Sequence, residues 1–200
     1  MLDPIGSTSW HHRHLACFRK LDEILRAAAL DEPTVLLVGP GGVTCAAAPM
    51  LNDAAEDACV LRRLLGDAAR YSDQVLRRIP GMPLRSLEPV ELAKTLSVPH
   101  RLIVADRSQR VLAAVSRDLP GVTCHCVDIS FQPLPVRAEV VIAFNIISRL
   151  GDGAATGVGH VVEAVLPGGW LLMDDRSADA HLGVSSQFTR VAPKTYRRSC

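Results

Sequence analysis

The sequence predicts an α/β protein built on a doubly wound, mostly parallel sheet. Three observations support this fold class. Several short segments are almost wholly apolar, helical segments alternate with them, and a glycine-rich loop, GPGG at 39–42, directly follows the first apolar segment. Strands that alternate with helices along one chain join into a parallel sheet with helices on both faces.

The first elements follow from the spacing of apolar residues. Residues 15–30 carry apolar side chains at helical spacing, which predicts an amphipathic helix. Residues 34–38 form a short apolar run, typical of a strand in the middle of a parallel sheet. Residues 44–50 can begin a helix after the glycine loop.

An insertion follows the first strand. Residues 39–101 separate it from the next strand, whereas a complete strand–helix–strand unit needs only about 30 residues. Helical patterns at 54–65, 67–79 and 89–96 predict a helical insertion over residues 50–100. We expect it to lie over the carboxyl edge of the sheet or to act as a partner-binding arm, through which homo- or hetero-oligomers could form.

From residue 101 the alternation becomes regular. We expect strands at 101–106, 122–128, 139–145 and 170–175, with helices at 109–118 and 157–165. The C-terminal end is shortened: a helix reduced to 178–182 precedes residues 186–199, which form one edge strand or a cramped hairpin. We interpret residues 1–200 as a single domain with an N-terminal helical segment at 1–33.

Composition and charge narrow the class of partner. The chain is 48% hydrophobic and 22% charged, as in a folded globule, and its net charge of +1 gives no electrostatic reason to bind nucleic acid or an anionic membrane. No apolar run approaches the roughly 18–20 residues that span a bilayer, and the N-terminus does not resemble a secretory signal. We expect a cytoplasmic protein with a small-molecule substrate and no nucleic-acid or membrane partner.

The cysteines indicate free thiols rather than a metal site. Six cysteines occur without a CxxC pair, which fits a reducing cytoplasm. Cys124, His125 and Cys126 invite a metal interpretation, but a strand presents at most two of them on one face and no second pair follows at zinc spacing. We therefore expect no metal.

The sequence of the glycine loop limits which classes of ligand it can bind. It lies at the carboxyl end of the first strand, where sheets of this kind bind their ligands. A triphosphate loop needs a lysine that this loop lacks. A dinucleotide loop matches at Gly39 and Gly41 but has Thr44 at its third position, which leaves an NAD(P)-dependent oxidoreductase as one alternative. Asp106 could bind ribose hydroxyls or cap the following helix.

Five segments, in order over residues 34–175, carry a family resemblance. They are VLLVGPGG, LIVADRS, CVDISFQPLP, EVVIAFNIISRL and VLPGGWLLMDD. In this order they resemble the five strand motifs of the class I S-adenosylmethionine-dependent methyltransferases, and the chain is identified as a divergent member of that Rossmann-like superfamily. The resemblance implies S-adenosylmethionine as cofactor and methyl transfer, with a small molecule as the expected acceptor.

The resemblance also implies cofactor-binding residues. Gly39 and Gly41 would let the backbone approach the methionine and ribose part of the cofactor. Asp106 would accept hydrogen bonds from both ribose hydroxyls. Asp128 would accept one from the adenine amine, and Ile129 would pack on the ring.

Asn145 would line the pocket near the transferable methyl group. Each of these assignments has a structural alternative. The two glycines could serve only a tight turn, Asp128 could be a solvated strand end, and Asn145 could be a turn-forming cap.

Catalysis stays open at this stage. Leu37 stands where the family commonly has an acid, and Val43 stands where it has a third glycine. Methyl transfer depends mainly on positioning and needs a base only when the acceptor must lose a proton. We name no catalytic residue, because the candidates for a base are weak: His11, His12, His14, His160 and His181. A catalytically silent binding or assembly subunit is therefore the other alternative.

Overall fold

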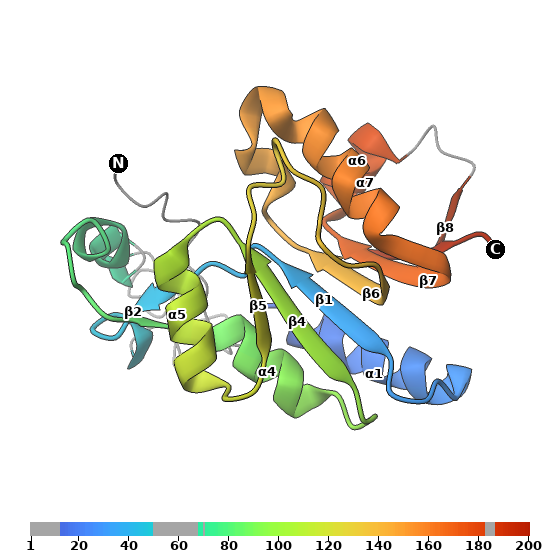
Figure 1. Ribbon diagram of the computed structural model, residues 1–200, viewed down its shortest axis with the longest axis horizontal. Coiled ribbons are helices and arrows are strands. Elements are labelled where there is room, and N and C mark those ends of the chain that lie inside the picture. The colour runs from blue at the N-terminus through green and yellow to red at the C-terminus, as the bar shows by residue number, and fades with distance from the viewer. Residues whose placement is uncertain (1–12, 50–67, 70, 183–186) are drawn as a thin grey trace.

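The computed structural model describes residues 13–49, 68–69, 71–182 and 187–200. Its centre is a seven-stranded sheet in the order β5-β4-β1-β6-β7-β9-β8 (Figure 1). β1 (Thr34–Val38) pairs in parallel with β4 (Arg101–Asp106) on one side and with β6 (Ala138–Ala143) on the other. β5 (Thr123–Cys126) and β7 (Val165–Met173) continue the parallel sheet outward.

A hairpin closes the C-terminal side of the sheet. β8 (Phe188–Ala192) and β9 (Thr195–Arg198) are antiparallel to each other, and β9 also pairs antiparallel with β7. Of the two arrangements expected for this segment, the cramped hairpin is the one that forms. The helix before it, α7 (Asp175–His181), begins earlier than the expected 178–182.

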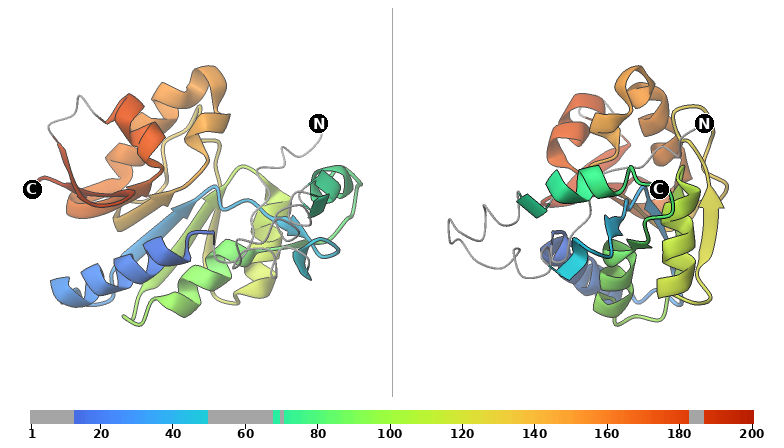
Figure 2. Two further views of the ribbon diagram at one scale, coloured as in Figure 1. Left: turned by 180° about the vertical axis from the view of Figure 1, so that it is seen from behind. Right: turned by 90° about the vertical axis from the view of Figure 1, so that its left-hand side faces the viewer.

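Helices cover both faces of the sheet, which confirms the doubly wound fold class (Figures 1 and 2). One hydrophobic cluster joins three helices to one face, and a second cluster joins two further helices to the other face. The first three are α1 (Leu15–Ala28), α4 (Leu87–Thr95) and α5 (Gln109–Asp118); the others are α6 (Ala154–Ala164) and α7, preceded by the short 3-10 turns η1 (Ile147–Arg149) and η2 (Gly151–Gly153).

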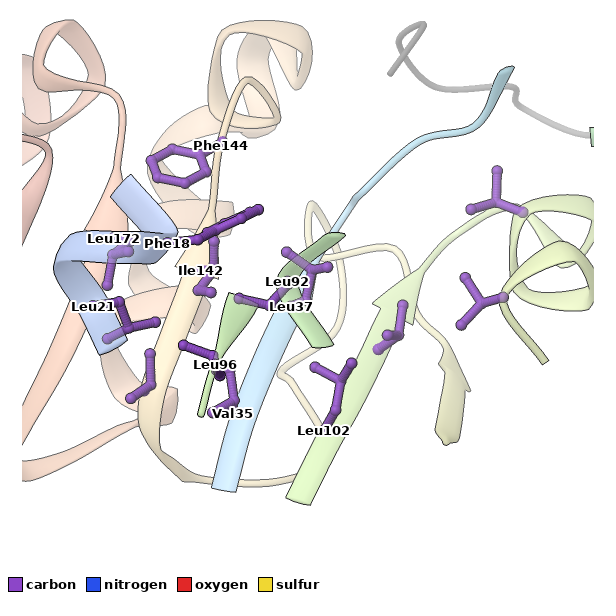
Figure 3. Close-up of a cluster of buried hydrophobic side chains, with 14 of the residues drawn as sticks. Phe18, Leu21, Val35, Leu37, Leu92, Leu96, Leu102, Ile142, Phe144 and Leu172 are labelled. Atoms are coloured by element: carbon purple, nitrogen blue, oxygen red, sulfur yellow. The ribbon is translucent and has the colours of Figure 1, made fainter. Parts of the chain in front are cut away.

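The central strand β1 contributes to both clusters. Val35 and Leu37 belong to the first cluster, whereas Leu36 and Val38 belong to the second, as expected for side chains that alternate along a strand. Leu37 is fully buried among the first cluster, which also contains Phe18 of α1 (Figure 3). The apolar residue at position 37 therefore serves the core beneath α1.

The segment after the glycine loop differs from the helix expected at 44–50. Val43–Thr44 is a short strand, β2, paired antiparallel with β3 (Leu84–Arg85), and helical geometry appears only at residues 48–49. Pairing with β3 holds the backbone extended and delays the helix. The helix expected at 54–65 lies outside the described residues; of that expected at 67–79, residues 68–69 and 71–76 are helical. The pattern at 89–96 belongs to α4.

Several strand boundaries also differ from the predicted ones. β5 ends at Cys126 and β6 at Ala143, so Asp128 and Asn145 each lie two residues beyond their strands, in loops. β7 begins at Val165 and passes through the Pro-Gly-Gly segment instead of starting at residue 170. A register shift between Ala138 and Val140 accommodates this segment beside β6.

Among the described residues, no helix is long and apolar enough to cross a membrane, and no three His, Cys, Asp or Glu residues gather as a metal site would require. Cys124 packs against the first cluster, while Cys126, two residues on, is exposed; both are free thiols.

A substitution at Gly169 tests how closely β7 packs against β6. A Cβ at this position would lie 2.6 Å from the backbone oxygen of Glu139 and 2.9 Å from that of Leu166. We expect Gly169→Ala to lower the free energy of unfolding by about 1–3 kcal/mol, because backbone must shift to admit the methyl group. Urea denaturation measures this change.

The matched control is Gly159→Ala in α6. A Cβ there meets nothing within 4 Å, so alanine should raise the free energy of unfolding by roughly 0.5–1 kcal/mol through its better helix propensity. Equal effects of the two substitutions would contradict the packing described for β7.

Candidate functional site

A pocket lies at the carboxyl ends of β5, β4, β1 and β6. It encloses about 490 Å³, including the part open to solvent. Five residues predicted from the sequence line it together: Gly39, Asp106, Asp128, Ile129 and Asn145. Gly41 is not among the residues that line this pocket.

Gly39 turns the chain sharply at the end of β1. Its φ is +62°, in the left-handed region, and its N–H donates a 2.7 Å hydrogen bond to the carbonyl oxygen of Ala105 in β4. A Cβ on Gly39 would lie only 2.2 Å from Cδ1 of Ile146. Both the turn and the close contact therefore require glycine, and the group that approaches its bare face is a side chain of the protein itself.

Asp106 is the last residue of β4 and is 5% exposed. Its Oδ1 accepts a 2.8 Å hydrogen bond from the backbone N–H of Ser108, whose hydroxyl in turn accepts one from the N–H of Val111. Ser108 is thus the cap of α5, and Asp106 orders the turn that leads to it. This structural role is compatible with a role in binding, because the carboxylate also lines the pocket.

The loop after β5 places a second carboxylate and an apolar side chain at the pocket. Asp128 Oδ1 accepts a 3.0 Å hydrogen bond from the N–H of Ser130, and Oδ2 lies 3.8 Å from Arg107. Ile129 is 2% exposed, and its carbonyl oxygen is 2.8 Å from Nδ1 of His160. His160, a weak candidate for a base, therefore holds this loop in place.

Asn145 occupies the loop after β6 with a φ of +55°. Its backbone N–H donates to Asp174 Oδ2 over 2.6 Å, and its Oδ1 accepts a 2.5 Å hydrogen bond from Arg13. Its Nδ2 lies 3.0 Å from Nε2 of His14. Asn145 is thus a left-handed turn residue whose side chain ties the beginning of α1 to the carboxyl edge of the sheet.

His14 is buried beside this turn, at 3% exposure, and stacks on Phe144 with ring centroids 4.1 Å apart. Burial, with a further contribution from nearby Arg13 and Lys194, lowers the pKa of His14 to about 3, and Asp174 opposes them. Since the amide nitrogen of Asn145 can only donate, Nε2 must accept and the ring proton must be on Nδ1. Nδ1 is buried and has no hydrogen-bond partner in the described part of the chain.

The insertion holds the glycine loop through two buried charges. Asp73 accepts a 2.6 Å hydrogen bond from the N–H of Thr44 and pairs with Arg77 at 2.9 Å. Arg77 also donates to the carbonyl oxygen of Gly42. Burial lowers the pKa of Arg77, while Asp73 acts in the opposite direction. The insertion therefore hydrogen-bonds to the backbone on both sides of Val43, the first residue of β2.

A second hollow adjoins the pocket. It encloses about 1000 Å³, including its open mouth, and shares four residues with the pocket: Arg107, Asp128, Arg149 and Leu150. Phe131, 82% exposed, stands at its wall. A small molecule bound there would lie next to a ligand in the pocket.

Sequence reasoning missed several residues of the site. Arg107 and Ile146 directly follow Asp106 and Asn145, so adjacency to a predicted residue could have identified them. No sequence signal joins Arg13 or His14 to Asn145, since more than 130 positions separate them. Of the other predicted base candidates, His11 and His12 lie outside the described residues.

No family model matches the chain, and no curated protein matches it. Solved structures with a similar fold include CalS10, an amino pentose methyltransferase from Micromonospora echinaspora solved with S-adenosylmethionine bound: identity is 19%, the alignment covers 82% of this chain and 51% of CalS10, and the TM-score is 0.46. Another is the N-methyltransferase NodS from Bradyrhizobium japonicum WM9, solved with S-adenosyl-l-homocysteine, at 13% identity, 90% and 85% coverage and a TM-score of 0.49.

KedS8, a sugar N-methyltransferase from Streptoalloteichus sp ATCC 53650, has 14% identity, 82% and 49% coverage and a TM-score of 0.44. The chain spans about half the length of CalS10 and KedS8. In this chain's own sheet, five parallel strands are followed by the antiparallel hairpin, and the last strand, β9, lies between β7 and β8. This strand order is the Rossmann-like fold of class I methyltransferases.

The buried His14 predicts a pH dependence of stability. In the unfolded chain its pKa is about 6.5, whereas in the folded protein it is about 3. Below pH 6.5 the unfolded chain therefore takes up a proton that the folded protein excludes, and stability is lost as the pH falls toward 3; above pH 6.5 this residue adds no pH dependence. We expect His14 to account for a loss of about 2 kcal/mol between pH 7 and pH 5.

Urea unfolding at both pH values, compared with His14→Gln, measures this contribution. Glutamine does not titrate but can still accept a hydrogen bond from Asn145. The variant should lose about 2 kcal/mol less than the parent over the same interval, and equal losses in both proteins would show that His14 does not titrate in this way.

Proposed function

We propose that this chain binds S-adenosylmethionine and transfers its methyl group to a small-molecule acceptor. The observation that carries the proposal is the shared pocket: Gly39, Asp106, Asp128, Ile129 and Asn145 come from four different strand ends and line one cavity. When bound, the cofactor supplies a methyl group on a sulfonium, so the protein need only bind and orient the two reactants.

The residues present fit the adenosine part of that cofactor. A buried carboxylate, Asp106, lies at the centre of the pocket and suits the two ribose hydroxyls. Asp128 and Ile129 lie next to it on the β5 side, where a carboxylate and an apolar side chain suit the amine and face of adenine. The acceptor is proposed to occupy the region around Asn145, at the end of the pocket toward which the transferable methyl group would point.

A catalytically silent binding subunit is the second candidate, and the surroundings of Asn145 favour it. Its Oδ1, Nδ2 and backbone N–H are all bonded within the protein, to Arg13, His14 and Asp174. Ile146 lies against the bare face of Gly39. In this arrangement both polar atoms of the Asn145 side chain are already engaged by Arg13 and His14, so an acceptor could use only their remaining hydrogen-bonding capacity.

Isothermal titration calorimetry with S-adenosylmethionine, S-adenosylhomocysteine and NAD separates the candidates. Binding of the first two supports the cofactor assignment, and methylation of added small molecules then distinguishes the enzyme from a silent subunit. Binding of none supports a scaffold without a cofactor. Binding of NAD alone would instead support an oxidoreductase.

Asp106 provides the residue-level test. We expect Asp106→Asn to weaken binding of S-adenosylhomocysteine by about tenfold or more, because hydrogen bonds to a charged carboxylate are worth roughly 1.5–3 kcal/mol each. The amide oxygen can still accept from Ser108, so the turn should persist. Calorimetry measures the affinity.

The matched control is Asp118→Asn. Asp118 also accepts a hydrogen bond from a backbone N–H, that of Ser86, but it lies at the end of α5 and does not line the pocket. This variant should bind the ligand as the parent does. Unchanged affinity in Asp106→Asn, or equal weakening in both variants, would overturn the ribose assignment.

A further inference from the structure

At the end of the pocket between β1 and β6, the side chain of Ile146 lies against Gly39. Ile146 Cδ1 packs against the α-carbon of Gly39: a Cβ placed there would lie 2.2 Å from Cδ1 and 3.1 Å from Cγ1. Both residues line the pocket. At this end of the pocket, the terminal methyl group of Ile146 therefore contacts the bare backbone of Gly39.

The order of strands fixes which part of a ligand meets this end of the pocket. Along the carboxyl edge the sheet runs β5, β4, β1, β6, so the lining residues follow in the order Asp128, Asp106, Gly39 and Ile146. With adenine at Asp128 and ribose at Asp106, as in the proposed function on which this inference rests, the next part of the ligand is the 5′ substituent. It must extend toward Gly39 and Ile146.

The residue before Ile146 keeps this contact in place. Asn145 has a φ of +55°, and its backbone N–H is bonded to Asp174. Its side chain is held by Arg13 and His14. With the preceding turn fixed, the Ile146 side chain can leave Gly39 only by rotating its own χ angles, a change that costs free energy when the new rotamer is strained.

We propose that Ile146 determines specificity at the 5′ position of the ligand. Adenosine, with a single hydroxyl at that position, is bound while Cδ1 stays on Gly39. S-adenosylmethionine and S-adenosylhomocysteine carry a sulfur and an amino-acid chain there, and they are bound only after Cδ1 is displaced. The affinity for the larger ligands is reduced by the cost of that displacement.

Ile146→Val tests the proposal because it removes Cδ1 and leaves the rest of the side chain. The matched control is Ile147→Val, which removes the same atom one position later, where the side chain is 2% exposed, packs in the second cluster and does not line the pocket. Each protein is titrated calorimetrically with adenosine and with S-adenosylhomocysteine. Thermal unfolding followed by circular dichroism checks that both variants are folded.

Ile146→Val should bind S-adenosylhomocysteine about three- to tenfold more tightly than the parent, with adenosine affinity changed less than twofold. Ile147→Val should leave both affinities unchanged. The proposal is overturned if Ile146→Val alters both ligands equally, fails to tighten S-adenosylhomocysteine, or behaves like its control. If neither ligand binds any of the three proteins, the proposed function itself fails, a result distinct from binding without selectivity.

Discussion

The left-handed turn at Gly39 is the constraint on which the rest of the site depends. Its N–H extends the pairing of β1 with β4 through a hydrogen bond to Ala105, so the chain leaves the sheet directly beside Asp106. A larger residue would be strained at this φ and would collide with Ile146. Gly39 thus fixes two spacings. It holds the glycine loop close to β4, and it lets the loop after β6 approach the end of β1.

A second turn, at Asn145, connects the pocket to the N-terminal helix. His14 is stacked on Phe144 and bonded to Asn145, and Lys194 from the C-terminal hairpin lies over the Phe144 ring, 5.6 Å from its centroid. The carboxylate of Asp174 joins both, accepting from Asn145 and from Lys194. Movement of Asn145 therefore disturbs its hydrogen bonds to Arg13 and His14, which precede α1, and to Asp174, which follows β7 and also holds Lys194 of the hairpin. A ligand that engages Asn145 must compensate for these bonds.

Apolar patterns predicted the sheet and most helices because each element buries a continuous face. Residues 34–38 alternate between two cores, and this alternation also explains why leucine occupies position 37 beneath α1. Contacts between distant segments could not be predicted in the same way. The pairing of β2 with β3 and the approach of Ile146 to Gly39 depend on how loops fold back, and a two-residue strand has too few side chains to form a pattern. The predicted site residues were those that the family resemblance implied at the strand ends, whereas the partners that already bond to them were not predicted.

The surroundings of the glycine loop favour an adenosyl ligand over a dinucleotide. Dinucleotide sites place the pyrophosphate at the N-terminus of a helix that begins directly after the loop, but here the loop leads into β2. The N–H of Thr44 already donates to the buried carboxylate of Asp73. A pyrophosphate at this N–H would have to displace that carboxylate, at the cost of breaking its buried ion pair with Arg77. A ligand whose 5′ group carries no phosphate avoids this cost, and a sulfonium, being cationic, has no need of the N–H at all.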